Sequence, residues 1–263
     1  MTLKDISFAT PQENILFDDV LLALAEKGEA GEILRFWESA QPFIVLGRIG
    51  QAQEDVDAAN AARDRIAVVR RSSGGGTVVQ GPGCLNYTLV LSKKFHRDIS
   101  DLRKSYQLIS QYVINAVHEL GVDAVFRPTS DIALRQGEQK FSGNAQRRGK
   151  NFILHHGTIL YNFDLNLIPT YLKMPKDIPE YRRARSHLDF VTNIPIVPEE
   201  FKRAFSRSLG IQAHPSELNQ QEQQHSDCAY SRRDQQQQAQ HQHGWRTWAR
   251  ASRLSRSPLI PNP

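Results

Sequence analysis

Residues 70–87 read RRSSGGGTVVQGPGCLNY, and three consecutive glycines there separate two strand-like segments. Backbone N–H groups that no Cβ shields allow a phosphate to approach closely, and Arg71 beside them offers charge-assisted donors. The stretch has neither the GxxxxGK[ST] pattern of a P-loop nor a convincing dinucleotide fingerprint followed by a helix. On its own it fits either an anion-binding loop or a simple hairpin.

Three amphipathic helices are expected around this stretch. Thr10-Pro11-Gln12-Glu13 has a capping threonine, a proline at the first helical position and an acidic first turn, so a helix should begin there. Apolar residues at helical spacing extend this helix to about Glu26. The same spacing predicts helices at residues 102–120 and 199–209.

Short strand-like segments account for most of the remaining apolar sequence. We expect strands at residues 33–37, 42–46, 66–71, 77–79, 85–91, 124–127, 132–134, 140–145 and 152–161. The strands after residue 124 are joined by no helix long enough for a parallel crossover. The predicted fold class is therefore α+β, with a mixed, largely antiparallel sheet packed with helices.

Composition excludes several classes of protein. The chain has 263 residues, 40% of them hydrophobic, and its two cysteines, Cys84 and Cys228, lack the spacing of a disulfide framework or a zinc site. No stretch of about 18 apolar residues is present, so we expect a soluble, cytoplasmic protein without membrane contact. The net charge of +5 suits an anionic ligand, but the basic residues are dispersed and no nucleic-acid partner is expected.

The composition changes abruptly near residue 211. Residues 220–242 are rich in Gln, His, Ser and Asp, and no periodic apolar face follows them. Such a segment cannot bury enough surface to offset the entropy lost on ordering. We therefore predict a folded domain at residues 1–210 and a disordered Gln-rich tail at residues 211–263. An interaction tail is one alternative, and a frameshift or truncation is another.

Two further segments carry chemistry. Asp131 precedes Lys140 by a short polar turn, and Lys140 begins a strand that continues into Ser142-Gly143. A lysine has three donors that could bridge a carboxylate and a phosphate, and Asp131 could hold Mg²⁺ or orient that lysine. By spacing alone, a solvated surface lysine is the simpler interpretation.

The third segment is His155-His156-Gly157-Thr158. Adjacent residues of a strand point to opposite faces, so the two histidines are a poor chelating pair. One of them should pack or form a hydrogen bond at a ligand site, and Gly157 allows close backbone approach. A purely structural histidine pair fits the sequence equally well.

Taken together and in order, these segments resemble the lipoate-protein ligase A family, within the wider group of biotin and lipoate ligase catalytic domains. The resemblance covers about residues 10–210 and is strong because six motifs occur in order. The motifs are residues 42–48, 70–79, 83–87, 130–131, 140–145 and 155–160, and residues 185–193 echo a later family segment.

The resemblance implies an ATP-dependent reaction in which lipoate and ATP form lipoyl-AMP and the lipoyl group then moves to a protein lysine. Lys140 matches the family's essential lysine, and Asp131 is a tentative Mg²⁺ ligand. The implied nucleotide-binding residues are Arg71, Gly75, Gly76, Thr77, Val78, Val79, Asn86, Asp131 and Lys140. The implied lipoyl-binding residues are Arg71, Gly76, Lys140, His156, Gly157 and Thr158, with the lipoyl chain in a tunnel between the glycine run and residues 156–157.

The resemblance also implies partners and alternatives. The acceptors would be lipoyl domains of 2-oxoacid dehydrogenase complexes or the glycine cleavage H protein. The accessory C-terminal domain of many such ligases is absent here, so a separate accessory domain could be needed for adenylation. An octanoyl or lipoyl transferase without adenylation is the main alternative, although it requires an activated thiolate. Biotin ligase fits the motifs less well, and a non-catalytic lipoyl-domain binding module is a third alternative.

Overall fold

A computed structural model describes residues 1–212, 215–219 and 221–226. Helix α1 (Pro11–Lys27) begins where the sequence predicts. The Thr10 hydroxyl accepts a hydrogen bond from the Glu13 backbone N–H, and the Glu13 carboxylate accepts one from the Thr10 N–H. This reciprocal cap satisfies two donors of the first turn. Gly28, with φ of 79°, ends the helix in the left-handed conformation.

Seven strands form the main sheet, in the order β1-β2-β6-β10-β9-β8-β7. Only the pair of β1 and β2 is parallel, whereas the other neighbours are antiparallel. The predicted α+β class with a largely antiparallel sheet is confirmed. In that order the bounds are Thr2–Asp5, Ile33–Trp37, Cys84–Ser92, Phe152–Leu160, Lys140–Arg148, Asp131–Leu134 and Ala124–Arg127.

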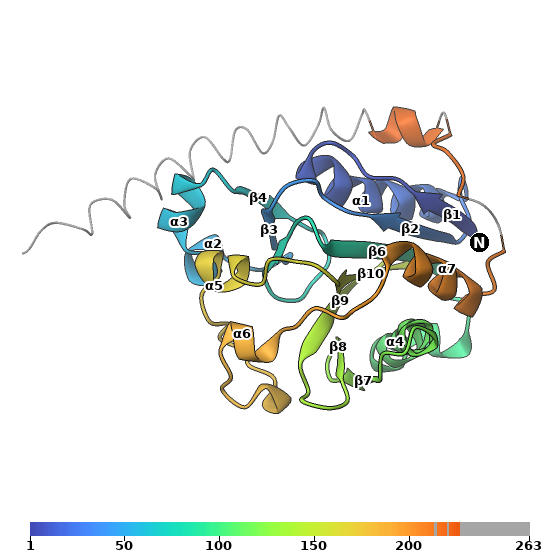
Figure 1. Ribbon diagram of the computed structural model, residues 1–263. Helices are drawn as coiled ribbons and strands as arrows, with labels where there is room; N and C mark the ends of the chain where they lie inside the picture. The colour runs from blue at the N-terminus through green and yellow to red at the C-terminus, as the bar shows by residue number, and fades with distance from the viewer. Residues whose placement is uncertain (213–214, 220, 227–263) are drawn as a thin grey trace, which may run out of the picture.

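Helices cover both faces of this sheet (Figure 1). On one face, α1 packs its apolar side against Ile33, Val90 and Leu154. On the other face, α4 (Leu102–Glu119) and α7 (Pro198–Ser208) enclose the largest hydrophobic cluster of the described residues. Side chains of successive strand residues alternate between these two layers, so the direction of each side chain follows from its position along the strand.

A smaller sheet lies beside the main one, in the order β4-β3-β5. Its strands are β3 (Phe43–Leu46), β4 (Ala67–Arg70) and β5 (Val78–Gln80). The glycine run of residues 74–76 connects β4 to β5. Short helices cover this sheet: α2 (Ala52–Asp55), α3 (Ala58–Arg63) and α5 (Leu167–Tyr171).

Several short elements were not predicted from the sequence. They are β1, α2, α3, α5, α6 (His187–Phe190) and two 3-10 turns at Arg97–Ser100 and Glu180–Arg182. None exceeds six residues, and fewer than two helical turns give no readable apolar period. No helix in the part of the chain that the structure describes is long and apolar enough to cross a membrane.

Residues beyond position 210 contact the N-terminal strand. Ser216 donates its backbone N–H to the carbonyl of Leu3 at 2.7 Å. The Lys4 ammonium lies 2.9 Å from the Glu222 carboxylate, and both side chains are buried. Packing of the described residues therefore continues past the boundary we predicted at residue 210. The predicted disorder of residues 211–263 falls largely outside the described residues, which omit positions 213–214, 220 and 227–263.

Candidate active site

The glycine loop, defined here as residues 72–77, is folded tightly against the loop that follows β3. A Cβ atom at Gly47 would lie 2.0 Å from the Gly75 carbonyl oxygen, so only glycine fits there. The Arg48 N–H donates to the Ser73 carbonyl at 2.8 Å, and Gly75 itself has a φ of 82°. Gly47 and Gly75 are therefore required by the backbone geometry.

Arg71 is folded under this loop. Its guanidinium donates to the carbonyl oxygens of Gly74 and Gly76, each at 2.7 Å. Burial lowers the pKa of Arg71 to about 10, and the side chain stays charged at neutral pH. The hydrogen-bond acceptors of its guanidinium are backbone carbonyl oxygens, which carry no net charge. An anionic ligand at the glycine loop would supply the missing negative charge.

Lys140 is the first residue of β9 and is held by a carboxylate. Its ammonium lies 2.8 Å from Oδ1 of Asp131, the first residue of β8, and the Lys140 side chain is only about a quarter exposed at 26%. A Cβ atom at Gly143 would lie 3.0 Å from Nζ of Lys140, so the lysine crosses directly over that glycine. Lys140 is therefore a partly buried, ion-paired lysine and not a freely solvated one.

Asp131 is fully engaged by the chain itself. Oδ1 accepts from Lys140, and Oδ2 accepts from the Tyr181 hydroxyl at 2.7 Å. Burial, together with the charge of Asp131, raises the pKa of Tyr181 above its ordinary value, so the phenol remains a donor. This geometry orients the lysine. It gives no support to the tentative Mg²⁺ site, because the Lys140 ammonium already pairs with this carboxylate and the described residues contain no group of three or more His, Cys, Asp or Glu side chains that could hold a metal ion.

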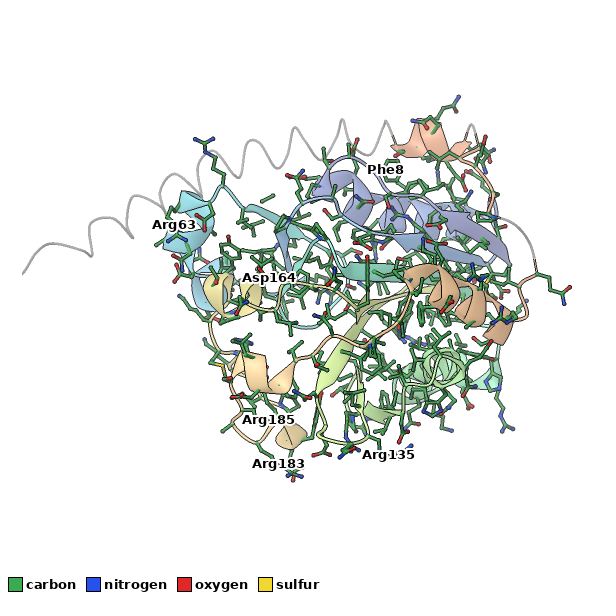
Figure 2. The ribbon with its side chains drawn as sticks, in the orientation of Figure 1. Phe8, Arg63, Arg135, Asp164, Arg183 and Arg185 are labelled. Carbon is green, nitrogen blue, oxygen red and sulfur yellow. The ribbon has the colours of Figure 1, made fainter. Side chains whose placement is uncertain are left out.

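Residues 180–192 form hydrogen bonds with β9 at Lys140 and with the turn that precedes it. Arg185 donates to the carbonyl oxygens of Gly137 and Glu138, at 2.9 and 3.1 Å. The backbone N–H of Thr192 donates to the Lys140 carbonyl at 2.9 Å. Figure 2 shows Arg183 and Arg185 at the end of the molecule where Arg135 also lies.

The two histidines of β10 point to opposite faces of the sheet, as predicted. His155 is buried; it stacks on Tyr87 and contacts Gln146 at 3.0 Å. Burial, together with the charge of His156, lowers the pKa of His155 to about 3, so it is neutral. His156 instead faces α1 and the glycine loop, and its Nε2 lies 2.6 Å from the Ser73 hydroxyl.

Gly157 lies against two buried polar side chains. A Cβ atom there would lie 2.0 Å from Oδ1 of Asn144 and 2.5 Å from the Tyr87 hydroxyl. These two side chains form a buried hydrogen bond in the space above the glycine. Gly157 therefore makes room for a polar contact within the protein. Thr158, the next residue, places its hydroxyl 3.5 Å from the Gly143 N–H, close to Lys140.

The remaining predicted residues lie at the end of the glycine loop, on β5 and on β6. Thr77 closes the glycine loop by donating its hydroxyl to Asp55 at 2.5 Å. Val78 and Val79 begin β5 and pair with β3, and Val79 is buried in the core of the small sheet. Asn86 lies opposite Thr158 in the sheet, but its amide donates to the Cys84 carbonyl at 3.1 Å.

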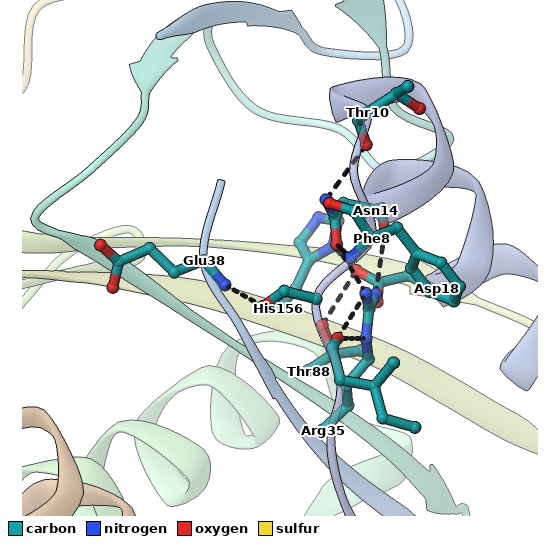
Figure 3. A network of polar contacts seen from close by, with 10 residues as sticks. Phe8, Thr10, Asn14, Asp18, Arg35, Glu38, Thr88 and His156 are labelled. Atoms are coloured by element: carbon teal, nitrogen blue, oxygen red, sulfur yellow. Dashed lines mark hydrogen bonds and ion pairs between the residues drawn. The ribbon is translucent and has the colours of Figure 1, made fainter. Parts of the chain in front are cut away.

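A buried polar network on α1 was missed in the sequence. Asp18 pairs with Arg35 at 2.7 Å and accepts from Thr88 at 2.9 Å, and all three side chains are buried (Figure 3). Burial raises the pKa of Asp18, but hydrogen bonding to His156 and the charge of Arg35 outweigh it, so the pKa lies below its usual value. The sequence did contain a signal for this network, because Asp18 and Asp19 are two adjacent acids among the apolar residues of α1.

The site thus combines three strands and one loop. On β9, Gly143 lies beside Lys140 and Ala145 lies beside Gly75. His156 of β10 lies opposite Ala145. Two cations, Arg71 and Lys140, sit near backbone N–H groups without Cβ shielding. Such an arrangement can bind an anionic acyl group or a phosphate and stabilise charge that develops during acyl transfer. The fold and the site therefore define a domain suited to binding an anionic ligand.

Comparison with known proteins identifies the family. Residues 10–210 match the lipoyl protein ligase A/B catalytic domain, and the chain belongs to this family. An octanoyltransferase, LipM of Oceanobacillus iheyensis, is 27% identical over 240 residues, covering 81% of this chain and 88% of that protein. The lipoate-protein ligase LplJ of Bacillus subtilis is 31% identical over 175 residues, covering 64% of this chain but only 51% of the ligase.

Solved structures show the same fold. A bi-partite lipoate protein ligase from Thermoplasma acidophilum superposes with a TM-score of 0.74 at 24% identity, covering 88% of this chain and 91% of that one. A lipoate-protein ligase A bound with ATP gives a TM-score of 0.73 at 22% identity, covering 88% of this chain and 94% of that one. The family match and the named relatives make the chain an enzyme of the lipoate ligase and octanoyltransferase kind.

Proposed function

We propose that this chain is an ATP-dependent lipoate-protein ligase that forms lipoyl-AMP and transfers the lipoyl group to a lysine of a lipoyl domain. The observation that carries the proposal is the Lys140 ammonium, fixed by Asp131 at 2.8 Å and lying over Gly143. An oriented, charged lysine next to a glycine-lined strand is suited to hold two anionic groups at once. The ATP-bound and lipoyl-domain-linked relatives support the same assignment.

In the first step, a carboxylate oxygen of lipoate attacks the α-phosphorus of ATP, the bond to the β-phosphate oxygen breaks, and pyrophosphate leaves. Lys140 would contact the carboxylate and the α-phosphate and reduce their mutual repulsion. The backbone N–H groups of Gly75 and Gly76, with the charge of Arg71 beneath them, would bind the phosphates. We assign Thr77, Val78, Val79 and Asn86 to the surroundings of the nucleotide.

In the second step, the neutral amine of the acceptor lysine attacks the acyl carbon of lipoyl-AMP. AMP leaves with the electrons of the acyl–phosphate bond, and the amine loses a proton. Lys140 would stabilise the negative charge on the acyl oxygen and on the departing AMP. His156 and Thr158 would border the lipoyl chain on β10. The acceptor would be a lipoyl domain of a 2-oxoacid dehydrogenase complex or the glycine cleavage H protein.

An octanoyltransferase is the second candidate, because the alignment covers 88% of LipM. Transfer through a thioester needs a reactive thiolate. Cys84 is buried, and burial raises the pKa of its thiol far above the ordinary value. Cys84 is therefore unsuited to this role, and Cys228 lies outside the described residues. This weighs toward the ligase.

The test is pyrophosphate exchange into ATP by the full chain, with lipoate, octanoate and biotin in separate reactions. Lipoate-dependent exchange is expected. Exchange with none of the acids, together with octanoyl transfer from octanoyl-acyl carrier protein, would establish the transferase instead. The absence of both pyrophosphate exchange and octanoyl transfer would indicate a non-catalytic binding module. Because the alignment covers 51% of LplJ, the assay is repeated with a separately supplied accessory domain of a two-part ligase.

A further inference from the structure

Two adjacent acids of α1 hold two adjacent serines of the glycine loop. Asp19 accepts a hydrogen bond directly from the Ser72 hydroxyl. Asp18 reaches Ser73 through a histidine: Oδ2 of Asp18 lies 3.3 Å from Nδ1 of His156, and Nε2 of His156 lies 2.6 Å from Oγ of Ser73. The loop is thus attached to the main sheet and to α1 at two consecutive residues.

The direction of the hydrogen bonds along this chain follows from Asp18. Asp18 is buried, with a side chain that is 2% exposed. Its carboxylate is paired with the Arg35 guanidinium and is thereby fixed in place (Figure 3). A carboxylate only accepts hydrogen bonds. With one proton on the His156 ring, the Nδ1–H donates to Asp18, and Nε2 is left to accept the proton of the Ser73 hydroxyl.

The order serine, histidine, aspartate is also that of a hydrolase triad. The surroundings of Ser73 do not fit a nucleophile. Ser73 is 1% exposed, its carbonyl accepts from the Arg48 N–H, and the neighbouring Gly47 and Gly75 backbones are in close contact. An acyl carbon cannot reach a hydroxyl enclosed in this way without unfolding the loop. The hydrogen bond instead fixes the loop.

We propose that Asp18 and His156 are positioning residues that hold the glycine loop in its anion-binding shape before the substrate binds. Gly75 and Gly76 closely follow Ser73, so fixing Ser73 sets the direction of their backbone N–H groups. A loop ordered in advance loses less entropy when the ligand binds. The identity of that ligand rests on the proposed function, whereas the ordering of the loop does not.

The test is hydrogen–deuterium exchange of residues 72–77 in the full chain without ligand. His156→Ala and Ser73→Ala should speed amide exchange there about tenfold, since both remove the buried hydrogen bond between His156 and Ser73. His156→Gln should restore most of the protection, because its amide offers one donor and one acceptor. His118→Ala is the matched control: His118 contacts the Ala124 backbone, away from the loop, and should leave residues 72–77 unchanged.

Three results would overturn the proposal. Unchanged loop exchange in both His156→Ala and Ser73→Ala would show that the hydrogen bond does not order the loop. Equal losses of loop protection in His156→Gln and His156→Ala would show that a hydrogen-bond donor and acceptor at position 156 are not what orders the loop. An octanoyl group found on Ser73 by mass spectrometry, after incubation with an octanoyl thioester, would make Ser73 a nucleophile.

Kinetics separate this proposal from the proposed function. If the native chain catalyses pyrophosphate exchange, His156→Ala should raise the KM for ATP about tenfold, with kcat changed less than about threefold. A kcat loss without a KM change would contradict positioning. If the native chain shows no exchange at all, the proposed function fails, and the deuterium measurements still decide the role of His156.

Discussion

Gly76→Ala separates binding from folding at the glycine loop. A Cβ atom at Gly76 would meet no atom within 4 Å, and its backbone is outside the left-handed region, so the variant should fold normally. Removing a glycine also limits the unfolded chain, which adds about 0.4–1 kcal/mol to stability. The melting temperature should therefore stay the same or rise by a few degrees.

The same methyl group should interfere with ATP. If a phosphate approaches the Gly76 N–H, the Cβ atom occupies part of its path and weakens one or two hydrogen bonds to a charged group. Each such bond contributes about 1.5–3 kcal/mol, which corresponds to a KM for ATP raised about ten- to hundredfold. The assay is pyrophosphate exchange at varied ATP, alongside a thermal melt.

Gly31→Ala is the matched control, because Gly31 is exposed and lies away from the glycine loop, in the turn after α1. A Cβ atom at Gly31 would also meet no atom within 4 Å. This control should change neither KM nor kcat. An unchanged KM in Gly76→Ala would refute the reasoning that the loop binds the nucleotide. A large fall in the melting temperature of Gly76→Ala would contradict the expectation that a Cβ atom fits at Gly76 without contacting other atoms.

Three further predictions follow from buried groups. Gly157→Ala should destabilise the fold by about 2–5 kcal/mol, since the methyl group overlaps Asn144 and Tyr87 and disrupts their buried hydrogen bond. A melting temperature within about 2 °C of the native value, which corresponds to roughly 1 kcal/mol, would contradict this. His155 is neutral when folded, with a pKa of about 3. The free energy of unfolding should therefore fall by about 1.4 kcal/mol per pH unit below about pH 6.5. When the free energy of unfolding is measured by denaturant titration at several pH values, it should depend less steeply on pH in His155→Gln than in the native chain. Cys84→Ala should retain acyl transfer to a lipoyl domain, whereas loss of transfer from a stable variant would favour a thioester route.

The long helices and most strands could be predicted from sequence because their signals are local. Thr10 caps α1 as predicted, and the predicted helix at residues 102–120 corresponds to α4 at Leu102–Glu119. The short helices around the small sheet could not be predicted, because tertiary contacts rather than an apolar period stabilise them. Strand β1 is four residues long and depends on pairing with β2.

The site was only partly predictable. Lys140 and Asp131 were identified as a candidate pair, but spacing alone favoured a solvated lysine until the structure placed them in contact. The opposite faces of His155 and His156 followed from strand geometry. Asp18 was missed because its partners, Arg35, Thr88 and His156, come from three separate strands. A long-range polar network leaves no fixed spacing in a sequence.

The central claim is that Lys140 activates lipoate with ATP, and lipoate-dependent pyrophosphate exchange by the native chain and by Lys140→Ala tests it most directly. The account predicts exchange by the native chain and a loss of at least about a hundredfold in the variant, since a charged contact in the transition state is removed. Substantial exchange by a correctly folded Lys140→Ala protein would contradict it.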